Sequence, residues 1–466
     1  MAMFSRVIGV MLLISAVYPV SLDTWGFALT AVLIVFFSAL WFSRGWWRHW
    51  IPDLPAKIQI QHILLLALLL RVWVLCCCDL TQISDYHDFN QIARAMLQGG
   101  AWFDPGRPPG ISWLTAACYA IAGEHLLVPL LMNIFISLCS IFVVWKGANL
   151  LFNGTVALWG ALLLALYPEH IIHANYLCSE PGYFLGMNAG ILFYVLSVKQ
   201  PDHKNVFLAL SGLFLGIGHY FRSTTPLVFV SIALAEGVLL LQTTPAQRPS
   251  FRPALTRLTG LVVAFLLVIS PIIWHNRQNL GIWNISSYQM GGWSMYLATN
   301  PVYLGNWNAE DVAFFDSLCT VHPPPAAQNG YLYRDSLSKH LAWKRFKTHP
   351  GTYFASVLLF KPYCLWGDPS GSFWVNQQFS PGTLAARFFG LWLVVWHKLI
   401  LCAAGLALFR AKRLDSRYVF PLMAHIYLFF AIFNTLAFSV MGTEGRYHNV
   451  LLGWLCWWAA VTIRRR

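Results

Sequence analysis

The stretch LVPLLMNIFISLCSIFVVWK, residues 127–146, decides the fold of this chain. It carries no charged residue before Lys146, and as an α-helix it would be about 30 Å long. That length matches the hydrocarbon core of a lipid bilayer. The stretch therefore predicts a transmembrane helix, and apolar stretches of similar length lie on both sides of it in the sequence.

The composition of the whole chain extends this prediction. Of its 466 residues, 58% are hydrophobic and 11% are charged, with a mean hydropathy of +0.57. A soluble domain carries roughly 25% charged residues, so this chain has too few polar groups to cover a soluble surface. We predict an all-α, polytopic membrane protein. This class excludes a cytosolic enzyme, a secreted disulfide scaffold and a nucleic-acid-binding domain.

A bilayer-spanning helix needs about 20 mostly apolar residues. We predict about 12 such helices, at residues 7–22, 26–43, 60–78, 127–146, 153–168, 181–198, 205–219, 224–242, 258–274, 388–409, 418–438 and 448–463. Arg71 falls within the third of these spans, near its outer end, where we expect its side chain to reach the membrane surface.

The basic residues predict the orientation of these helices. An even number of spans places both termini on one side of the membrane. Seventeen of the 31 Lys and Arg residues fall on alternate joints together with three acids, while the opposite face carries nearly all the other acids. The positive-inside rule makes the basic side cytoplasmic. The net charge of +13 is thus an orientation signal, with membrane lipids as secondary partners and no nucleic acid. The short joints favour a bacterial inner membrane.

The spans divide the chain into four parts. We expect two additional transmembrane helices (1–50), a transmembrane core (51–274) that includes a first extracytoplasmic loop (79–126), a large extracytoplasmic loop (275–387) and the C-terminal transmembrane helices (388–466). Two apolar segments, 110–122 and 352–366, are too short to span comfortably. Counting either as a span would move every later loop to the opposite side of the membrane and place the Arg-rich joints outside. We therefore predict that both segments are helices at the outer membrane surface.

The first outer loop contains the acids best suited to catalysis. Asp85 and Asp88 lie three residues apart, so on a helix they share one face beside Phe89. A carboxylate at a membrane surface, backed by aromatic residues, suits a general base. The alternative, when the loop is considered alone, is a pair of solvated acids.

Further polar residues lie at the outer ends of the predicted spans. They are Glu180, Arg222, Arg277, Arg446 and Tyr447, and Arg107 lies within the first outer loop, where the chain turns into the predicted helix at 110–122. Each alone is typical of an interface residue whose charge reaches water. Together, several acids and arginines on one face favour a ligand with an anionic head and an apolar tail, since the planar guanidinium binds phosphate well.

Several segments resemble those of the C-superfamily of membrane glycosyltransferases (GT-C), especially the branch of the protein O-mannosyltransferases and the lipid A aminoarabinose transferase, family 39. The likeness rests on SDYHDFNQIARAMLQGG (84–100), GRPPG (106–110), YPEHIIHANYLCSEPGYF (167–184), HNRQNLGIWNISSYQMGGWSMYLATNPVYLG (275–305) and EGRYHNVLL (444–452). The chain departs from the family in placing the acidic loop after its third span and in lacking a proline after Arg446-Tyr447.

The resemblance implies a glycosyltransferase, transferring a hexose or a pentose from a polyprenyl-phosphate donor, with inversion, at the outer membrane face. The acceptor would be a hydroxyl of a cell-envelope glycan, a lipid or a protein. Asp85, rather than Asp88, aligns with the family's acid and would take the acceptor proton. Glu180 would orient the sugar or the acceptor, and the arginines would bind the phosphate. No metal or other cofactor is implied, although a divalent ion between Asp85 and Glu180 stays open.

Two other functions fit the predicted layout. Twelve spans are common in transporters, including a flippase for lipid-linked sugars, but we find neither internal repeats nor broken helices. An O-antigen polymerase or ligase also combines many spans with a large outer loop, and the short motifs fit it less well.

Overall fold

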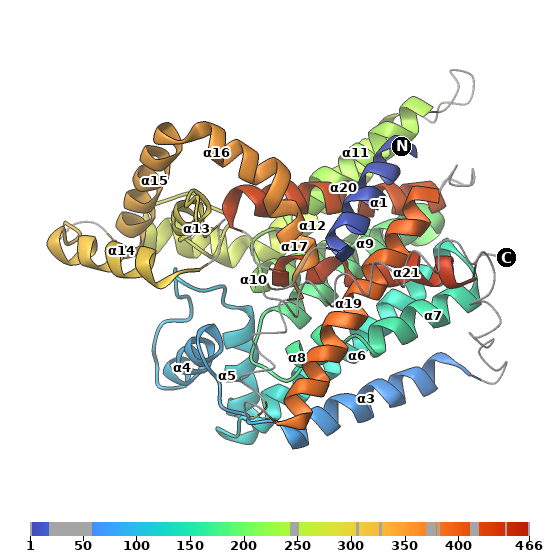
Figure 1. The fold of residues 1–466 in the computed structure, drawn as a ribbon, viewed down its shortest axis with the longest axis horizontal. Coiled ribbons are helices and arrows are strands. Elements are labelled where there is room, and N and C mark those ends of the chain that lie inside the picture. Colours follow the sequence, from blue (N-terminus) through green and yellow to red (C-terminus); the bar gives the residue numbers. More distant parts are fainter. Residues whose placement is uncertain are drawn as a thin grey trace.

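The computed structural model describes residues 2–17, 58–242, 251–303, 307–325, 329–369, 379, 383–410, 419–442 and 445–464. Throughout these residues the regular secondary structure is helical (Figure 1). The all-α prediction is therefore confirmed for this part of the chain. The predicted span 26–43 lies outside the described residues.

Six described helices are long and apolar enough to cross a membrane. They are α3 (Ile60–Cys77), α6 (Leu127–Leu151), α9 (Glu180–Lys199), α12 (Phe251–Leu280), α19 (Leu384–Arg410) and α20 (Val419–Met441). Shorter apolar helices follow other predicted spans, namely α1 (Ala2–Val17), α7 (Gly154–Ala165) and α11 (Pro226–Gln242). In the described residues, length and composition thus support six of the twelve spans.

These helices form one bundle around α9. α9 packs along α10 (Lys204–Phe221), and α10 packs along α12. On another side of the bundle, α19 contacts both α1 and α21 (Leu452–Arg464). α9 is the most enclosed of the six long apolar helices. Its first residue, Glu180, is therefore held in the interior of the protein.

Glycines allow α9 and α10 to approach closely. A Cβ atom built on Gly186 would lie 2.5 Å from the Cα of Gly218 and 2.8 Å from the carbonyl oxygen of Phe214. Both neighbours are backbone atoms, so they cannot rotate away as a side chain can. A larger residue at 186 would push the two helices apart.

We expect Gly186→Ala to destabilise the protein by about 1 to 3 kcal/mol, as overpacking of a tight core does. Thermal unfolding in detergent measures the effect as a lower Tm. Gly237→Ala in α11 is the matched control, because nothing lies within 4 Å of its added Cβ. An equal Tm for the two variants would contradict the close approach.

A lobe of shorter helices covers one end of the bundle. Figure 1 shows α13 to α16 gathered there beside α4 and α5, whereas the start of α1 and the end of α21 lie toward the opposite end. The lobe contains α4 (Asp85–Leu97), α5 (Gly110–Ala122), α13 (Gly291–Ala298), α14 (Ala309–Val321), α15 (Gly330–Thr348), α16 (Pro350–Ala355) and η4 (Ser356–Phe360). Two further short helices lie against the bundle: α8 (Pro168–His173) contacts α3 and α19, and α17 (Lys361–Gly367) contacts α1.

Both predicted surface helices are present as helices. Residues 110–122 form α5, and residues 352–366 fall within the run from α16 through η4 to α17. The position of these helices at the membrane surface stays a prediction.

An ion pair ties the helices of the lobe together. Arg345 of α15 pairs with the buried carboxylate of Asp311 of α14 and donates to the hydroxyl of Tyr296 of α13 at 2.9 Å. The Asn308 side chain caps α14 by accepting from the backbone N–H of Asp311. The lobe thus has its own polar framework, on which the residues near the site are mounted.

The prediction for Arg71 is wrong. Its side chain is fully buried instead of reaching the membrane surface. Nε donates to the Ser137 hydroxyl at 2.8 Å, and Nη2 donates to Nδ1 of His170 at 2.7 Å. α6 and α8 therefore supply inside the bundle the hydrogen-bond acceptors that water would otherwise supply.

Candidate active site

Asp85 opens helix α4 at a strained turn. The preceding residue, Ser84, has φ +52° and ψ −134°, a conformation rare for a residue with a side chain. Such strain costs about 1 to 3 kcal/mol and persists only where the surrounding structure enforces it. The turn points the first carboxylate of α4 toward the bundle.

Arg107 bridges the two acids of this helix. Its Nη2 lies 2.9 Å from Oδ1 of Asp85 and 2.8 Å from Oδ2 of Asp88. The turn that carries Arg107 is held by Asp104, whose carboxylate accepts from the backbone N–H of Gly106 at 2.6 Å. Burial alone would lower the pKa of Arg107, but the two carboxylates raise it. The guanidinium therefore stays charged.

A second arginine approaches Asp85 from a segment more than 350 residues later in the chain. The guanidinium of Arg446, in the 3₁₀-helix η5 (Gly445–Leu451), lies 3.3 Å from Oδ2 of Asp85. Arg446 also lies over the ring of Tyr447, 5.7 Å from its centroid. Asp85 is thus flanked by two guanidinium groups.

The buried carboxylate of Glu180 forms an ion pair with the partly buried Arg222 next to these residues. The Arg222 guanidinium lies over the ring of Tyr447, 5.0 Å from its centroid, so Arg222 and Arg446 contact the same aromatic ring. Burial alone would lower the pKa of Arg222, but Glu180 raises it. Tyr447 therefore joins the Glu180–Arg222 pair to Arg446 and, through it, to Asp85.

A pocket of about 190 Å³ lies where these groups meet. Its wall includes Asp85, Arg107, Arg446 and Tyr447. We call this cavity the central pocket. Glu180 does not line it, so its carboxylate acts on the pocket through Arg222 and Tyr447.

Other residues of the wall come from the segment 288–307 and from the end of α20. They include Tyr288, Trp293, Ser294, Trp307 and Met441. Tyr288 is the main residue that sequence reasoning did not single out. The only signal for it was its position inside the motif at 275–305, since a tyrosine beside two serines is not by itself typical of a site.

The structure brings together seven of the eight residues predicted from the sequence. Arg277 is the exception. It lies at the exposed end of α12, donates to the carbonyl oxygen of Gly281 at 3.1 Å and lies over the ring of Trp283. Glu444, part of the same motif as Arg446, lies outside the described residues.

Buried groups hold η5 in place behind the central pocket. Nδ1 of His448 lies 2.7 Å from the carbonyl oxygen of Leu365, and Nε2 lies 3.3 Å from Oε2 of Glu169. Asn188 of α9 donates to the carbonyl oxygen of Val450 at 3.1 Å. Arg446 and Tyr447 are thus presented by a backbone that α8, α9 and α17 all anchor.

Among the described residues, the group of three His and acid side chains spaced for a metal ion is Glu169, His397 and His448, with ligand atoms within 4.8 Å of one another. Both ring nitrogens of His397 already contact protein groups: Nε2 the Trp366 carbonyl at 2.7 Å and Nδ1 the Tyr167 hydroxyl at 2.6 Å. We therefore interpret this group as a structural hydrogen-bond network.

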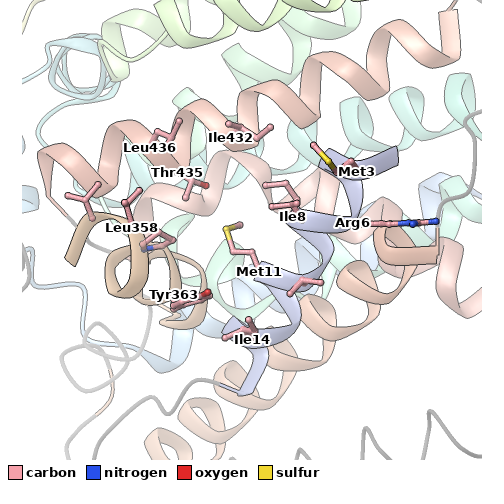
Figure 2. Close-up of a pocket in the computed structure, with 14 residues that line it drawn as sticks. Met3, Arg6, Ile8, Met11, Ile14, Leu358, Tyr363, Ile432, Thr435 and Leu436 are labelled. Atoms are coloured by element: carbon pink, nitrogen blue, oxygen red, sulfur yellow. The ribbon is translucent and has the colours of Figure 1, made fainter. Parts of the chain in front are cut away.

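An apolar groove of about 590 Å³ runs between α1, η4 and α20. Figure 2 shows Ile8 and Met11 of α1 facing Ile432 and Thr435 of α20 across it. Farther along α20, Met441 lines the central pocket. One helix therefore carries residues of both the groove and the pocket.

Comparisons with known proteins show which family and which fold the chain is similar to. Residues 106–274 match the family described as dolichyl-phosphate-mannose-protein mannosyltransferase. The oligosaccharyltransferase of Archaeoglobus fulgidus in its apo form has 14% identity and a TM-score of 0.51, over 88% of this chain and 51% of that chain. This chain thus spans about half of that protein. No curated protein matches it.

Two further solved structures are similar at lower scores. AglB from Archaeoglobus fulgidus with an inhibitory peptide and a dolichol-phosphate has 14% identity and a TM-score of 0.47, over 86% of this chain and 50% of that chain. ArnT from Cupriavidus metallidurans bound to undecaprenyl phosphate has 16% identity and a TM-score of 0.38, over 82% and 77%.

The family match and the fold together confirm the resemblance to the GT-C membrane glycosyltransferases: this chain has their fold, and it carries the mannosyltransferase-family signature over residues 106–274.

Proposed function

We propose that the protein transfers a single sugar from a polyprenyl-phosphate donor to a hydroxyl acceptor at the outer face of the membrane. One observation carries the proposal: Asp85, Arg446 and Tyr447 line one pocket, so a candidate base and a candidate phosphate ligand meet there. The relatives named above include proteins solved with dolichol-phosphate and with undecaprenyl phosphate. That chemistry supports a lipid-phosphate donor for this chain.

In the proposed reaction the acceptor oxygen attacks the anomeric carbon of the donor sugar. The bond from this carbon to the phosphate oxygen breaks, and the electron pair leaves with the phosphate. Asp85 takes the proton of the acceptor hydroxyl. The products are the glycosylated acceptor, with inverted configuration at the anomeric carbon, and free polyprenyl phosphate.

The arginines stabilise the leaving group. As the phosphate departs it gains negative charge, and Arg446 lies in the pocket where that charge develops. Preorganised donors of this kind contribute roughly 3 kcal/mol each. Arg222 and Glu180 act through Tyr447, because their ion pair positions its ring.

The apolar groove of Figure 2 suits the isoprenoid tail of the donor. It is lined almost entirely by apolar side chains of α1, η4 and α20, such as Ile8 and Leu436. α20 connects it with Met441 at the central pocket. A lipid anchored by its phosphate near Arg446 would thus find an apolar surface for its chain.

The orientation follows from the charge pattern of the sequence. We propose that both termini are cytoplasmic and that the site faces the periplasm of a bacterial inner membrane, since the basic residues cluster on alternate joints. Cysteine labelling from each side of sealed vesicles tests this, with one cysteine placed at Gln98 or at Lys204 in a variant whose ten native cysteines are replaced by serine.

The first test of function uses the purified protein in lipid vesicles with a panel of polyprenyl-phosphate sugars. We expect release of free polyprenyl phosphate together with sugar on extracted envelope acceptors. Movement of intact lipid between leaflets without transfer would identify a flippase instead. Transfer only from lipid-diphosphate oligosaccharides would identify a polymerase or ligase.

We expect EDTA to leave the transfer rate unchanged, because arginines can neutralise a monophosphate leaving group without a metal. The measurement compares initial rates in EDTA and after adding Mg²⁺, Mn²⁺ or Zn²⁺. A rate that EDTA abolishes and one of these ions restores would instead support a metal between Asp85 and Glu180.

A further inference from the structure

A second cleft adjoins the central pocket. Its volume is about 420 Å³, within the range of roughly 300 to 1,000 Å³ that small-molecule sites occupy. Arg107, Tyr288 and Trp293 line both cavities and form a common wall. We call this cavity the outer cleft.

The outer cleft is built from four segments that are distant in the sequence. α4 contributes Gln91, the turn at 104–107 and the loop at 288–293 form its floor, and Tyr331 comes from the start of α15. The turn and the loop are joined by a hydrogen bond of 2.8 Å from the backbone N–H of Gln289 to the carbonyl oxygen of Pro105.

Tyr331 is seated on this turn. A Cβ atom built on Gly106 would lie 2.7 Å from Cε1 of the tyrosine ring, so the ring rests on the glycine backbone. This close contact positions the Tyr331 ring over the turn. The outer cleft is thus formed by contacts between separate segments of the lobe.

The charge of the outer cleft differs from that of the central pocket. Asp88 and Asp104 line it, and among the described residues of its lining the cation is Arg107, whose charge Asp85 and Asp88 already balance. Half of the Asp88 side chain remains exposed to solvent. The outer cleft therefore disfavours a phosphate or another anion, whereas Arg446 in the adjoining central pocket favours one.

The remaining side chains suit a hydroxyl-rich ligand. Carboxylates and the Gln91 amide can pair with several hydroxyl groups at once. Trp293 and Tyr331 present aromatic surface, and Trp293 is braced from behind by Phe315, with ring centroids 5.0 Å apart. A saccharide offers both hydroxyl edges and an apolar C–H face, so it matches both parts of the lining.

We propose that the outer cleft binds the acceptor of the reaction, and that this acceptor is a neutral saccharide. The inference rests on the proposed function for its link to catalysis. That link is Arg107, which contacts both Asp85 and Asp88. An acceptor hydroxyl held beside Asp88 is therefore separated from the proposed base by a single side chain.

The test measures binding directly and does not depend on transfer. Saturation-transfer NMR on the full-length protein in detergent uses three probes: neutral trisaccharides, a neutral peptide containing Ser and Thr, and a bisphosphorylated glucosamine disaccharide. We expect the trisaccharides to bind. Gln91→Ala and Tyr331→Ala should each weaken this binding about tenfold, or 1.4 kcal/mol.

Tyr333→Ala is the matched control. Tyr333 lies two residues farther along α15, outside the cleft, and its hydroxyl donates to the carbonyl oxygen of His322 at 3.0 Å. Saccharide binding in this variant should equal that of the wild type, which also shows that the lobe remains folded.

The outcomes separate the two proposals. Saccharide binding that the cleft variants do not weaken, no saccharide binding, or preferential binding of the peptide or the phosphorylated disaccharide would each overturn the assignment of the outer cleft. If saccharide binding depends on Tyr331 but the protein transfers sugar from none of the donors, the outer cleft is a saccharide site and the proposed function is wrong.

Discussion

Asp85→Asn should lower the rate of sugar transfer by roughly 100- to 10,000-fold, the usual contribution of a general base, while donor binding is retained. Asparagine has the same shape, and its single carbonyl oxygen can still accept a hydrogen bond from either Arg107 or Arg446, which contact different oxygens of Asp85. It cannot take the acceptor proton. The measurement combines the release of polyprenyl phosphate with the equilibrium binding of the donor, both in lipid vesicles.

Two variants of neighbouring acids sharpen this result. Asp79→Asn is the control, because Asp79 lies exposed in the same outer loop and its carboxylate bonds to Thr81. Its transfer rate should equal that of the wild type. Asp88→Asn should lower the transfer rate less than Asp85→Asn does, since Asp88 contacts Arg107 and does not line the central pocket. Full transfer activity in Asp85→Asn would rule this residue out as the base.

Arg446→Ala is the second large expected effect. The loss of one preorganised donor at the departing phosphate should lower the turnover rate by roughly 100- to 1,000-fold. Arg446→Lys should recover part of it, because lysine restores the charge without the planar fork of donors. Single-turnover measurements with a bound donor separate this effect on chemistry from an effect on donor binding.

Arg94→Ala provides the control for Arg446. Arg94 lies on α4, the helix that Asp85 opens, and its exposed side chain pairs with Glu124 at 3.4 Å. This variant removes a positive charge from the same lobe without touching the central pocket. If both variants lost activity to a similar extent, the effect would come from the general charge of the lobe rather than from a contact with phosphate.

The sequence predicted the all-α fold class and most of the residues that the structure brings together in the candidate site, for identifiable physical reasons. Uninterrupted apolar stretches such as 127–146 are stable only where they are removed from water, inside a membrane or a protein core. Asp85, Glu180 and Arg446 stood out because charged residues are rare in this chain and each adjoins an apolar stretch. The number of spans was harder to predict, since helices such as α7 (Gly154–Ala165) are shorter than the apolar stretches around them.

Three-dimensional contacts explain what the sequence could not indicate. Arg71 appeared to be near a membrane surface, but Ser137 and His170 come from other helices to bind it. Arg277 carries the same chemistry as Arg446, yet the end of α12 directs it to Gly281 and Trp283. The charge of a residue is visible in the sequence, whereas the element that directs its side chain is not.

The attachment of η5 has a consequence for genetic studies of this protein. Arg446 and Tyr447 are carried by a single short turn, and that turn is held by His448 against Glu169 and the Leu365 carbonyl. Alleles that alter Glu169 or His448 should therefore mimic loss of Arg446, the proposed phosphate ligand, although neither Glu169 nor His448 lines the central pocket. A screen that ranks positions by lost activity would recover the scaffold of the site together with its chemistry.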